Sequence, residues 1–179
     1  ILFIGRICKD KGVFDLIDAF SILKKKHRNI KLMFVGMEEE NISSAISESN
    51  ILSEDIIKVD YTDNPELYFI SCDIFCLPSY REGFGNVVLE ASSASKPVVA
   101  SDIYGLKDIA KNDSNALTFQ TGNINDLAHK LSLLIQNQNL CEKLGLEGRK
   151  ISEKHFNEKE VVIKYNNFFK KYLLNEKNI

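Results

Sequence analysis

The sequence has few of the residues that mark disulfide-rich, redox or membrane-spanning proteins. Its four cysteines, Cys8, Cys72, Cys76 and Cys141, are scattered, and none forms the CxxC spacing of zinc and redox sites. We expect reduced, structural thiols, which suit a cytoplasmic protein. No apolar run approaches the ~20 residues of a membrane-spanning helix, and no signal peptide opens the chain, so we expect any contact with the inner face of the plasma membrane to be peripheral.

Several catalytic signatures are also absent. No Asp-x-Asp occurs, so the usual carboxylate clamp for a nucleotide-bound metal is missing. There is no GxxxxGK[ST] loop and no GxGxxG turn, and no Ser, His and Asp set suggests a nucleophilic hydrolase. We therefore predict no metal and no cofactor, and the positive charge for any bound diphosphate must come from Arg and Lys.

Size and charge narrow the class further. The 179 residues are 44% hydrophobic, which is enough to bury the core of one domain. The formal net charge of -2 provides no overall field for a polyanion, so we expect no nucleic-acid partner. The chain opens directly in an apolar run without an initiator Met, and we interpret it as a segment of a longer protein.

Short β-rich runs alternate with helical patterns along most of the chain. This alternation is typical of parallel βαβ units and predicts the α/β class, with a Rossmann-like parallel sheet flanked by helices. After a last short run the pattern becomes purely helical from about Asn125, and we expect a single domain over residues 1–179. The predicted strands are residues 1–6, 30–36, 56–59, 73–78, 96–101 and 115–119.

Two helical segments leave alternatives open. The helix between the first two strands ends in the basic cluster 24–28, which is either solvated charge at a helix C-terminus or a membrane contact. The last helix begins near Asn157 and carries a broad apolar face. That face packs either on its own domain or on an absent partner domain. Its members are Val161, Val162, Tyr165, Phe168, Phe169 and Tyr172.

Ligands of open α/β sheets bind beyond the carboxyl ends of the strands, so the loops there carry most information. Gly5 and Arg6 follow the first strand, and Lys9, Lys11 and Gly12 precede a helix. Glycines, cations and a helix N-terminus suit a diphosphate, although Lys9 and Lys11 are equally explained as solvated surface charge.

The loop after the fourth strand is the most informative segment. Gly83 and Gly85 allow backbone amides to face a ligand, and Asn86 can cap a helix that carries Glu90. Glu82 and Glu90 can converge on one cleft, where their carboxylates would accept hydrogen bonds from vicinal sugar or ribose hydroxyls. The alternative is that neither residue binds a ligand: Glu90 would interact only with the helix dipole, and Glu82 would be an exposed acid of the loop.

These motifs, in this order, resemble the carboxyl-terminal domain of the GT-B fold glycosyltransferases of the group 1 type, also called family 4. The resemblance rests on GR...KG near the start, DIFCLPSYREGFGNVVLEA in the middle and KPVVASDIYGLKDI after it. Its most specific element is the Glu-x7-Glu pair formed by Glu82 and Glu90. One departure lies at residues 103–106, where many members carry a glycine-rich or proline-containing turn.

The resemblance implies roles for individual residues. Arg6 and Lys11 would neutralise the diphosphate of a nucleotide-sugar donor, Glu82 would bind sugar hydroxyls, and Glu90 would hold the ribose. Arg6, Lys11 and Glu82 are the implied catalytic residues. The base would rest near residues 59–62. The implied substrate-binding residues are Glu90, Gly83, Phe84, Gly85, Asn86 and Tyr61.

The resemblance also implies a whole reaction. The donor would be a UDP-sugar or GDP-sugar, the acceptor a glycan or a lipid-linked glycan of a bacterial surface polysaccharide or lipopolysaccharide, and the transfer retaining and metal-independent. An amino-terminal acceptor domain would be absent from this chain, residues 157–174 would be the terminal crossover helix, and the fragment alone would be inactive. A sugar-nucleotide epimerase of the same fold and a non-catalytic nucleotide-binding module remain alternatives.

Overall fold

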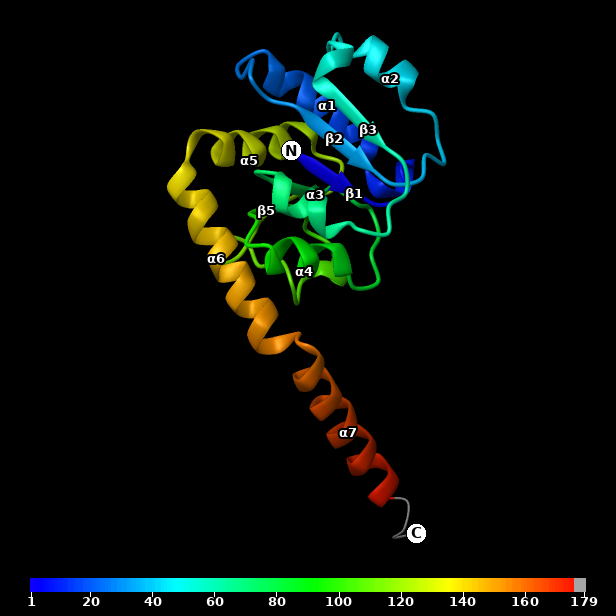
Figure 1. Cartoon of the computed structure of the whole chain (residues 1–179), viewed down its shortest axis with the longest axis vertical. Helices are drawn as coiled ribbons and strands as arrows, with labels where there is room; N and C mark the ends of the chain where they lie inside the picture. The colour runs from blue at the N-terminus through cyan, green and yellow to red at the C-terminus, as the bar shows by residue number, and fades with distance from the viewer. Residues whose placement is uncertain (176–179) are drawn as a thin grey trace.

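The computed structural model describes residues 1–175, and its body is a parallel sheet between layers of helices (Figure 1). The sheet has six strands in the order β3-β2-β1-β4-β5-β6, and every neighbouring pair is parallel. The predicted α/β class and all six predicted strands are therefore confirmed. The strands are β1 (Leu2–Ile4), β2 (Leu32–Val35), β3 (Ile56–Val59), β4 (Phe75–Leu77), β5 (Val98–Ser101) and β6 (Leu117–Phe119).

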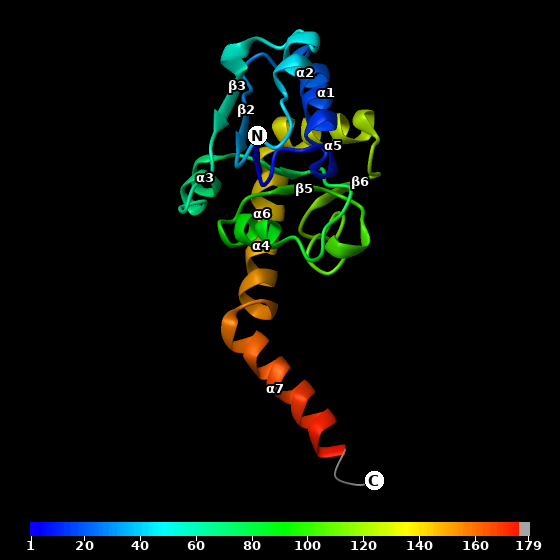
Figure 2. The ribbon, with the colours of Figure 1, turned by 90° about the vertical axis from the view of Figure 1, so that its right-hand side faces the viewer.

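Helices cover both faces of this sheet (Figure 2). On one face α1 packs against α5, and on the other α4 packs against α3 and α6. The α-helices are α1 (Val13–Lys24), α2 (Ser43–Glu48), α3 (Glu66–Ser71), α4 (Asn86–Ser93), α5 (Ile124–Gln136), α6 (Gln138–His155) and α7 (Glu158–Asn175), and the 3-10 turns are η1 (Lys9–Lys11), η2 (Ser53–Asp55) and η3 (Tyr104–Leu106).

The strand order reverses between β1 and β4. After β3 the chain crosses back over the sheet and adds β4 beside β1, where Leu2 pairs with Phe75. The loops that leave β1 and β4 consequently diverge to opposite faces. Such a reversal opens a crevice beyond the carboxyl ends of the two strands, which is where ligands bind in open α/β sheets.

The core consists of the side chains between the sheet and its helices. Phe3 packs on Phe34 at a ring-centroid distance of 5.8 Å, and Phe69 packs edge-on against Phe75 at 5.3 Å. All four rings are at most 1% exposed. Burial raises the pKa of the Cys72 thiol to about 11, which keeps it neutral at physiological pH and agrees with a structural role.

The last helix projects away from this body. Figure 1 shows α7 continuing beyond α6 with no other element beside it. Its apolar side chains are well exposed, for example Tyr165 at 63% and Phe168 at 57%. The helix begins where the sequence predicted, but the alternative in which its apolar face packs on its own domain is wrong.

The ends of β1 and β2 approach each other at two glycines, which generates a first prediction. Gly36 has a φ of +136°, and a Cβ there would overlap the carbonyl oxygen of Gly5. We expect Gly36→Ala to lower the free energy of unfolding by at least about 2 kcal/mol, because backbone strain and overlap both oppose the side chain. Urea unfolding followed by circular dichroism measures the loss.

Gly83→Ala is the matched control. A Cβ at Gly83 meets no atom within 4 Å, so this change should leave the free energy of unfolding within ~0.5 kcal/mol of the wild type. Equal unfolding midpoints for the two variants would contradict the close approach of the two strand ends.

Candidate functional site

The loop after β1 lies directly against the end of β4. Gly12 adopts a left-handed conformation with a φ of 69° between η1 and α1. A Cβ at this position would overlap the carbonyl oxygen of Pro78, the residue that follows β4. Only glycine combines this φ with so close an approach at little cost. The turn that carries Lys9 and Lys11 is thereby pressed against the loop that begins at Ser79.

Hydrogen bonds tie the two loops together. The backbone N–H of Tyr80 donates to the carbonyl oxygen of Asp10 at 2.9 Å. The Arg81 guanidinium donates to the Asp10 carboxylate at 2.8 Å, and the Tyr80 hydroxyl donates to Asp15 on α1 at 2.7 Å. These bonds hold two segments about seventy residues apart in sequence in one arrangement.

Two of the predicted catalytic residues meet in this arrangement. Lys11 Nζ lies 2.7 Å from Glu82 Oε1, and the two side chains are only 19% and 12% exposed. Ser79 Oγ also donates to Glu82 Oε1, at 2.7 Å. The interpretation of Lys11 and Glu82 as freely solvated surface charges therefore does not hold.

Arg6, the third predicted catalytic residue, lies apart from this pair. Its Nη1 donates to both carboxylate oxygens of Glu39, at 2.9 and 3.2 Å. Hydrogen bonding to Glu39 raises the pKa of the guanidinium above its ordinary value, so Arg6 stays charged. Its side chain is 58% exposed, and it leaves the carboxyl end of β1, on the same edge of the sheet as Lys11.

The loop that follows Glu82 is shaped by glycines. Gly85 is left-handed with a φ of 70° and is itself the N-cap of α4, so the helix begins at Asn86. The expectation that Asn86 caps this helix is wrong, because no side chain bonds to its first turn and Gly85 occupies the cap position. A Cβ on Gly105 would overlap the carbonyl oxygen of Glu82, so the turn after β5 supports this loop from the other side.

Glu90 faces a hollow of about 820 Å³ between α3, α4 and α6. Desolvation and the charge of Glu66 raise the pKa of Glu90 above its ordinary value. Glu82 is not among the residues that line the hollow, so the two predicted carboxylates do not share this cleft. The lining includes Asp63, Glu66, Phe69, Ile70, Leu89, Glu90, Arg149, Ser152 and Phe156.

The two predicted aromatic residues lie at the surface. Tyr61 follows β3 and is 70% exposed. Phe84 is 40% exposed, and its ring packs on Phe156 at a centroid distance of 5.7 Å. Phe156 is the C-cap residue of α6. The loop of Glu82 thus touches the joint between α6 and α7.

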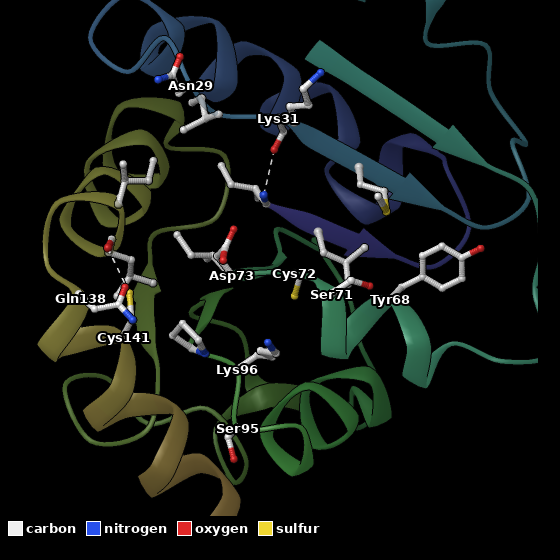
Figure 3. A pocket seen from close by; sticks show the side chains of 18 of the residues that line it. Asn29, Lys31, Tyr68, Ser71, Cys72, Asp73, Ser95, Lys96, Gln138 and Cys141 are labelled. Atoms are coloured by element: carbon white, nitrogen blue, oxygen red, sulfur yellow. Dashed lines mark hydrogen bonds between the residues drawn. The ribbon is translucent and has the colours of Figure 1, made fainter. Parts of the chain in front are cut away.

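A second hollow, of about 580 Å³, opens at the opposite edge of the sheet, beside the amino ends of β1, β4 and β5 (Figure 3). Its cations and thiols are occupied by backbone carbonyls: Lys31 bonds to Glu54, Lys96 to Ile70 and Cys141 to Leu134. The hollow lies at the amino ends of the strands, whereas ligands of open α/β sheets bind beyond the carboxyl ends, so the candidate site is the carboxyl edge.

Sequence reasoning missed several partners at the carboxyl edge. Ser79 and Glu39 bond to predicted site residues, and Glu66 shares the hollow with Glu90. Asp10 bonds to Arg81, the neighbour of Glu82. The position of Ser79 directly after a strand was the only signal available for it. Within residues 1–175, no group of three or more His, Cys, Asp or Glu side chains is arranged to hold a metal ion, and no helix is long and apolar enough to cross a membrane.

Several known proteins are similar to this chain in sequence. CapM of Staphylococcus aureus, a capsular polysaccharide biosynthesis glycosyltransferase, is 33% identical over 94% of this chain and 46% of its own length. A Campylobacter jejuni enzyme, N,N'-diacetylbacillosaminyl-diphospho-undecaprenol alpha-1,3-N-acetylgalactosaminyltransferase, is 36% identical over 78% of this chain and 36% of its own length. The chain thus spans about half or less of the length of these relatives.

A solved structure agrees with this fold. A variant of S. aureus TarM, in complex with fondaparinux, alpha-GlcNAc-glycerol and UDP, superposes with a TM-score of 0.86 at 27% identity, over 94% of this chain and 35% of TarM. The family model "Glycosyl transferases group 1" matches residues 1–151. The chain therefore belongs to the group 1 glycosyltransferase family, and its sheet is one half of a GT-B fold.

Proposed function

We propose that this chain is the donor-binding domain of a retaining glycosyltransferase that moves a sugar from UDP or GDP to a glycan acceptor without a divalent metal. The observation that carries the proposal is the Lys11–Glu82 pair. Its two charged atoms lie 2.7 Å apart, beyond the point at which the strand order reverses between β1 and β4. A cation for phosphate and a carboxylate for hydroxyls are thus adjacent at the edge of the sheet where ligands bind.

The diphosphate would lie over the loop that follows β1. Lys11 is already there, and the exposed Arg6–Glu39 pair contributes little to stability, so Arg6 can exchange Glu39 for a phosphate at small cost. The free N–H groups at the start of α1 favour the same anion. As the bond from the sugar to the diphosphate breaks, both cations stabilise the charge that develops on the leaving oxygen.

The sugar and the nucleoside would occupy the neighbouring places. Glu82 would accept hydrogen bonds from sugar hydroxyls, with the backbone amides of residues 83–86 beside them. Glu90, in its hollow, would accept from the ribose hydroxyls, and the base would rest near Tyr61. The acceptor oxygen would attack the anomeric carbon on the face from which the nucleotide departs, and its proton would pass to the leaving diphosphate.

The relatives support a UDP-sugar and a surface glycan. TarM was solved in complex with UDP and alpha-GlcNAc-glycerol, which favours UDP over GDP here. CapM acts in capsular polysaccharide biosynthesis, and the Campylobacter enzyme acts on a sugar carried by diphospho-undecaprenol. We therefore place the acceptor among glycans or lipid-linked glycans of bacterial surface polymers, including lipopolysaccharide.

An amino-terminal acceptor domain would complete the enzyme. The chain spans 46% of CapM, which leaves room in such a relative for a second domain of similar size. The apolar face of α7 is exposed in this domain, and we propose that it is the crossover helix that packs on the second domain. Transfer would require both domains, while nucleotide binding would require mainly this one.

Nucleotide binding is the direct test of the donor site. We expect the 179-residue chain to bind UDP in the presence of EDTA and to prefer it over ADP in calorimetric titrations. Arg6→Ala and Glu90→Ala should each weaken binding at least about tenfold, the effect of losing hydrogen bonds to a charged group. Arg28→Ala, which removes an exposed arginine beyond the far end of α1, should bind as the wild type does. Absence of binding, or binding only with divalent metal, would contradict the proposal.

The raised pKa of Glu90 predicts a pH dependence. Ribose hydroxyls donate to the ionised carboxylate, so the affinity for UDP should fall as the pH is lowered through the pKa of Glu90. Glu66→Gln removes one cause of the elevation, so the fall should move to lower pH. Titrations across a pH series measure the shift. The same series on Glu90→Gln corrects for protonation of UDP itself, and an unshifted profile in Glu66→Gln would count against this placement of the ribose.

The role of α7 can be tested by comparing this chain with the two-domain parent. In the isolated chain, Phe168 and Phe169 are 57% and 50% exposed, so Phe168→Ala should change the free energy of unfolding by no more than ~0.5 kcal/mol. In the parent the ring would be buried between domains, where its loss should cost about 3 kcal/mol or more. Equal effects in the two proteins would rule out docking on a second domain.

A further inference from the structure

Ser79 is a fully buried polar residue beside the proposed sugar site. It follows β4 by two residues and is 0% exposed. Buried hydroxyls need a partner, and the Oγ of Ser79 donates to Glu82 Oε1 at 2.7 Å. The bond spans only three residues, so it closes the turn between Ser79 and Glu82. A neutral hydroxyl here contacts the proposed sugar-binding carboxylate without being placed to contact sugar.

Both donors converge on the same oxygen of Glu82. Lys11 Nζ donates to Oε1 at 2.7 Å, as Ser79 does, and within residues 1–175 the other oxygen, Oε2, forms no hydrogen bond. A carboxylate held at one oxygen from two directions has little rotational freedom. Its second oxygen is then a preorganised acceptor, which avoids the cost of ordering the side chain when a ligand binds.

The backbone of Glu82 is held as well. A Cβ on Gly105 would overlap the carbonyl oxygen of Glu82, so the turn after β5 lies in contact with the main chain at Glu82 while Ser79 and Lys11 hold its carboxylate. Of the two side-chain donors, Lys11 would be drawn towards the diphosphate once a donor binds. Ser79 is buried and has no such second partner, so it is the donor that keeps Glu82 in place through the reaction.

We propose that Ser79 is a positioning residue for recognition of the donor sugar: it fixes Glu82 Oε1 so that Oε2 faces a sugar hydroxyl. This inference rests on the proposed function of the site. The inference predicts different effects on the two parts of the donor. Ser79 acts on the sugar through Glu82, but it touches neither Glu90, the proposed ribose ligand, nor the cation Arg6. Loss of the hydroxyl should therefore weaken binding of the sugar and leave binding of the nucleotide unchanged.

The experiment compares UDP with UDP-glucose, UDP-N-acetylglucosamine and UDP-N-acetylgalactosamine by calorimetry on the 179-residue chain. For the sugar that the wild type binds best, the ratio of UDP-sugar affinity to UDP affinity should fall about five- to tenfold in Ser79→Ala, which is the net contribution of one typical hydrogen bond. Ser79→Cys keeps the volume with a weaker donor and should lower the ratio by an intermediate factor, and it carries the test if the alanine variant does not fold.

Ser92→Ala is the matched control. Ser92 is also buried, at 1% exposure on α4, but its hydroxyl bonds to no group in the part of the chain described, so both affinities should match the wild type. A Ser79 variant that weakens UDP and UDP-sugar equally, or neither, would overturn the positioning role while leaving the proposed function intact. A wild type that binds no UDP would overturn both.

Discussion

The site depends on one close backbone approach, that of Gly12 to the carbonyl oxygen of Pro78. The two residues follow neighbouring parallel strands at the point where the strand order reverses, and the loops that leave such strands normally diverge. A side chain at position 12 would force them apart. Because glycine stands there, the backbone of Asp10 can bond to Tyr80, and the turn that carries Lys11 lies beside the loop that carries Glu82.

Because the two loops lie side by side, Lys11 and Glu82 can form an ion pair that has little exposure to solvent. Pairing Lys11 with Glu82 offsets the cost of removing both charges from water, and the Ser79 hydroxyl satisfies a further lone pair of the carboxylate. The arrangement adds little to stability relative to a well-packed apolar pair. Under the proposed function, a donor substrate would bring an anion for Lys11 and hydroxyls for Glu82 to groups that are already in position.

Much of the fold could be predicted because apolar runs and helical spacing are local signals, and all six strands and the start of α7 are confirmed. The pairing of Lys11 with Glu82 could not be predicted, because it depends on a tertiary contact between residues 71 positions apart in the sequence. Asn86 was assigned as a cap from its residue type, but Gly85 in the left-handed conformation takes that position. No sequence motif marked Glu66, and only the packing of α3 beside α4 brings it close to Glu90.

The loop of Glu82 also reaches the base of α7. Phe84 packs on Phe156 at 5.7 Å, at the joint where α6 ends and α7 begins. The same Phe156 lines the hollow of Glu90. Phe156 therefore contacts the loop of Glu82 and also forms part of the wall of the hollow of Glu90. Under the proposed docking of α7 on an acceptor domain, the contact of Phe156 with Phe84 would link that helix to the loop of Glu82.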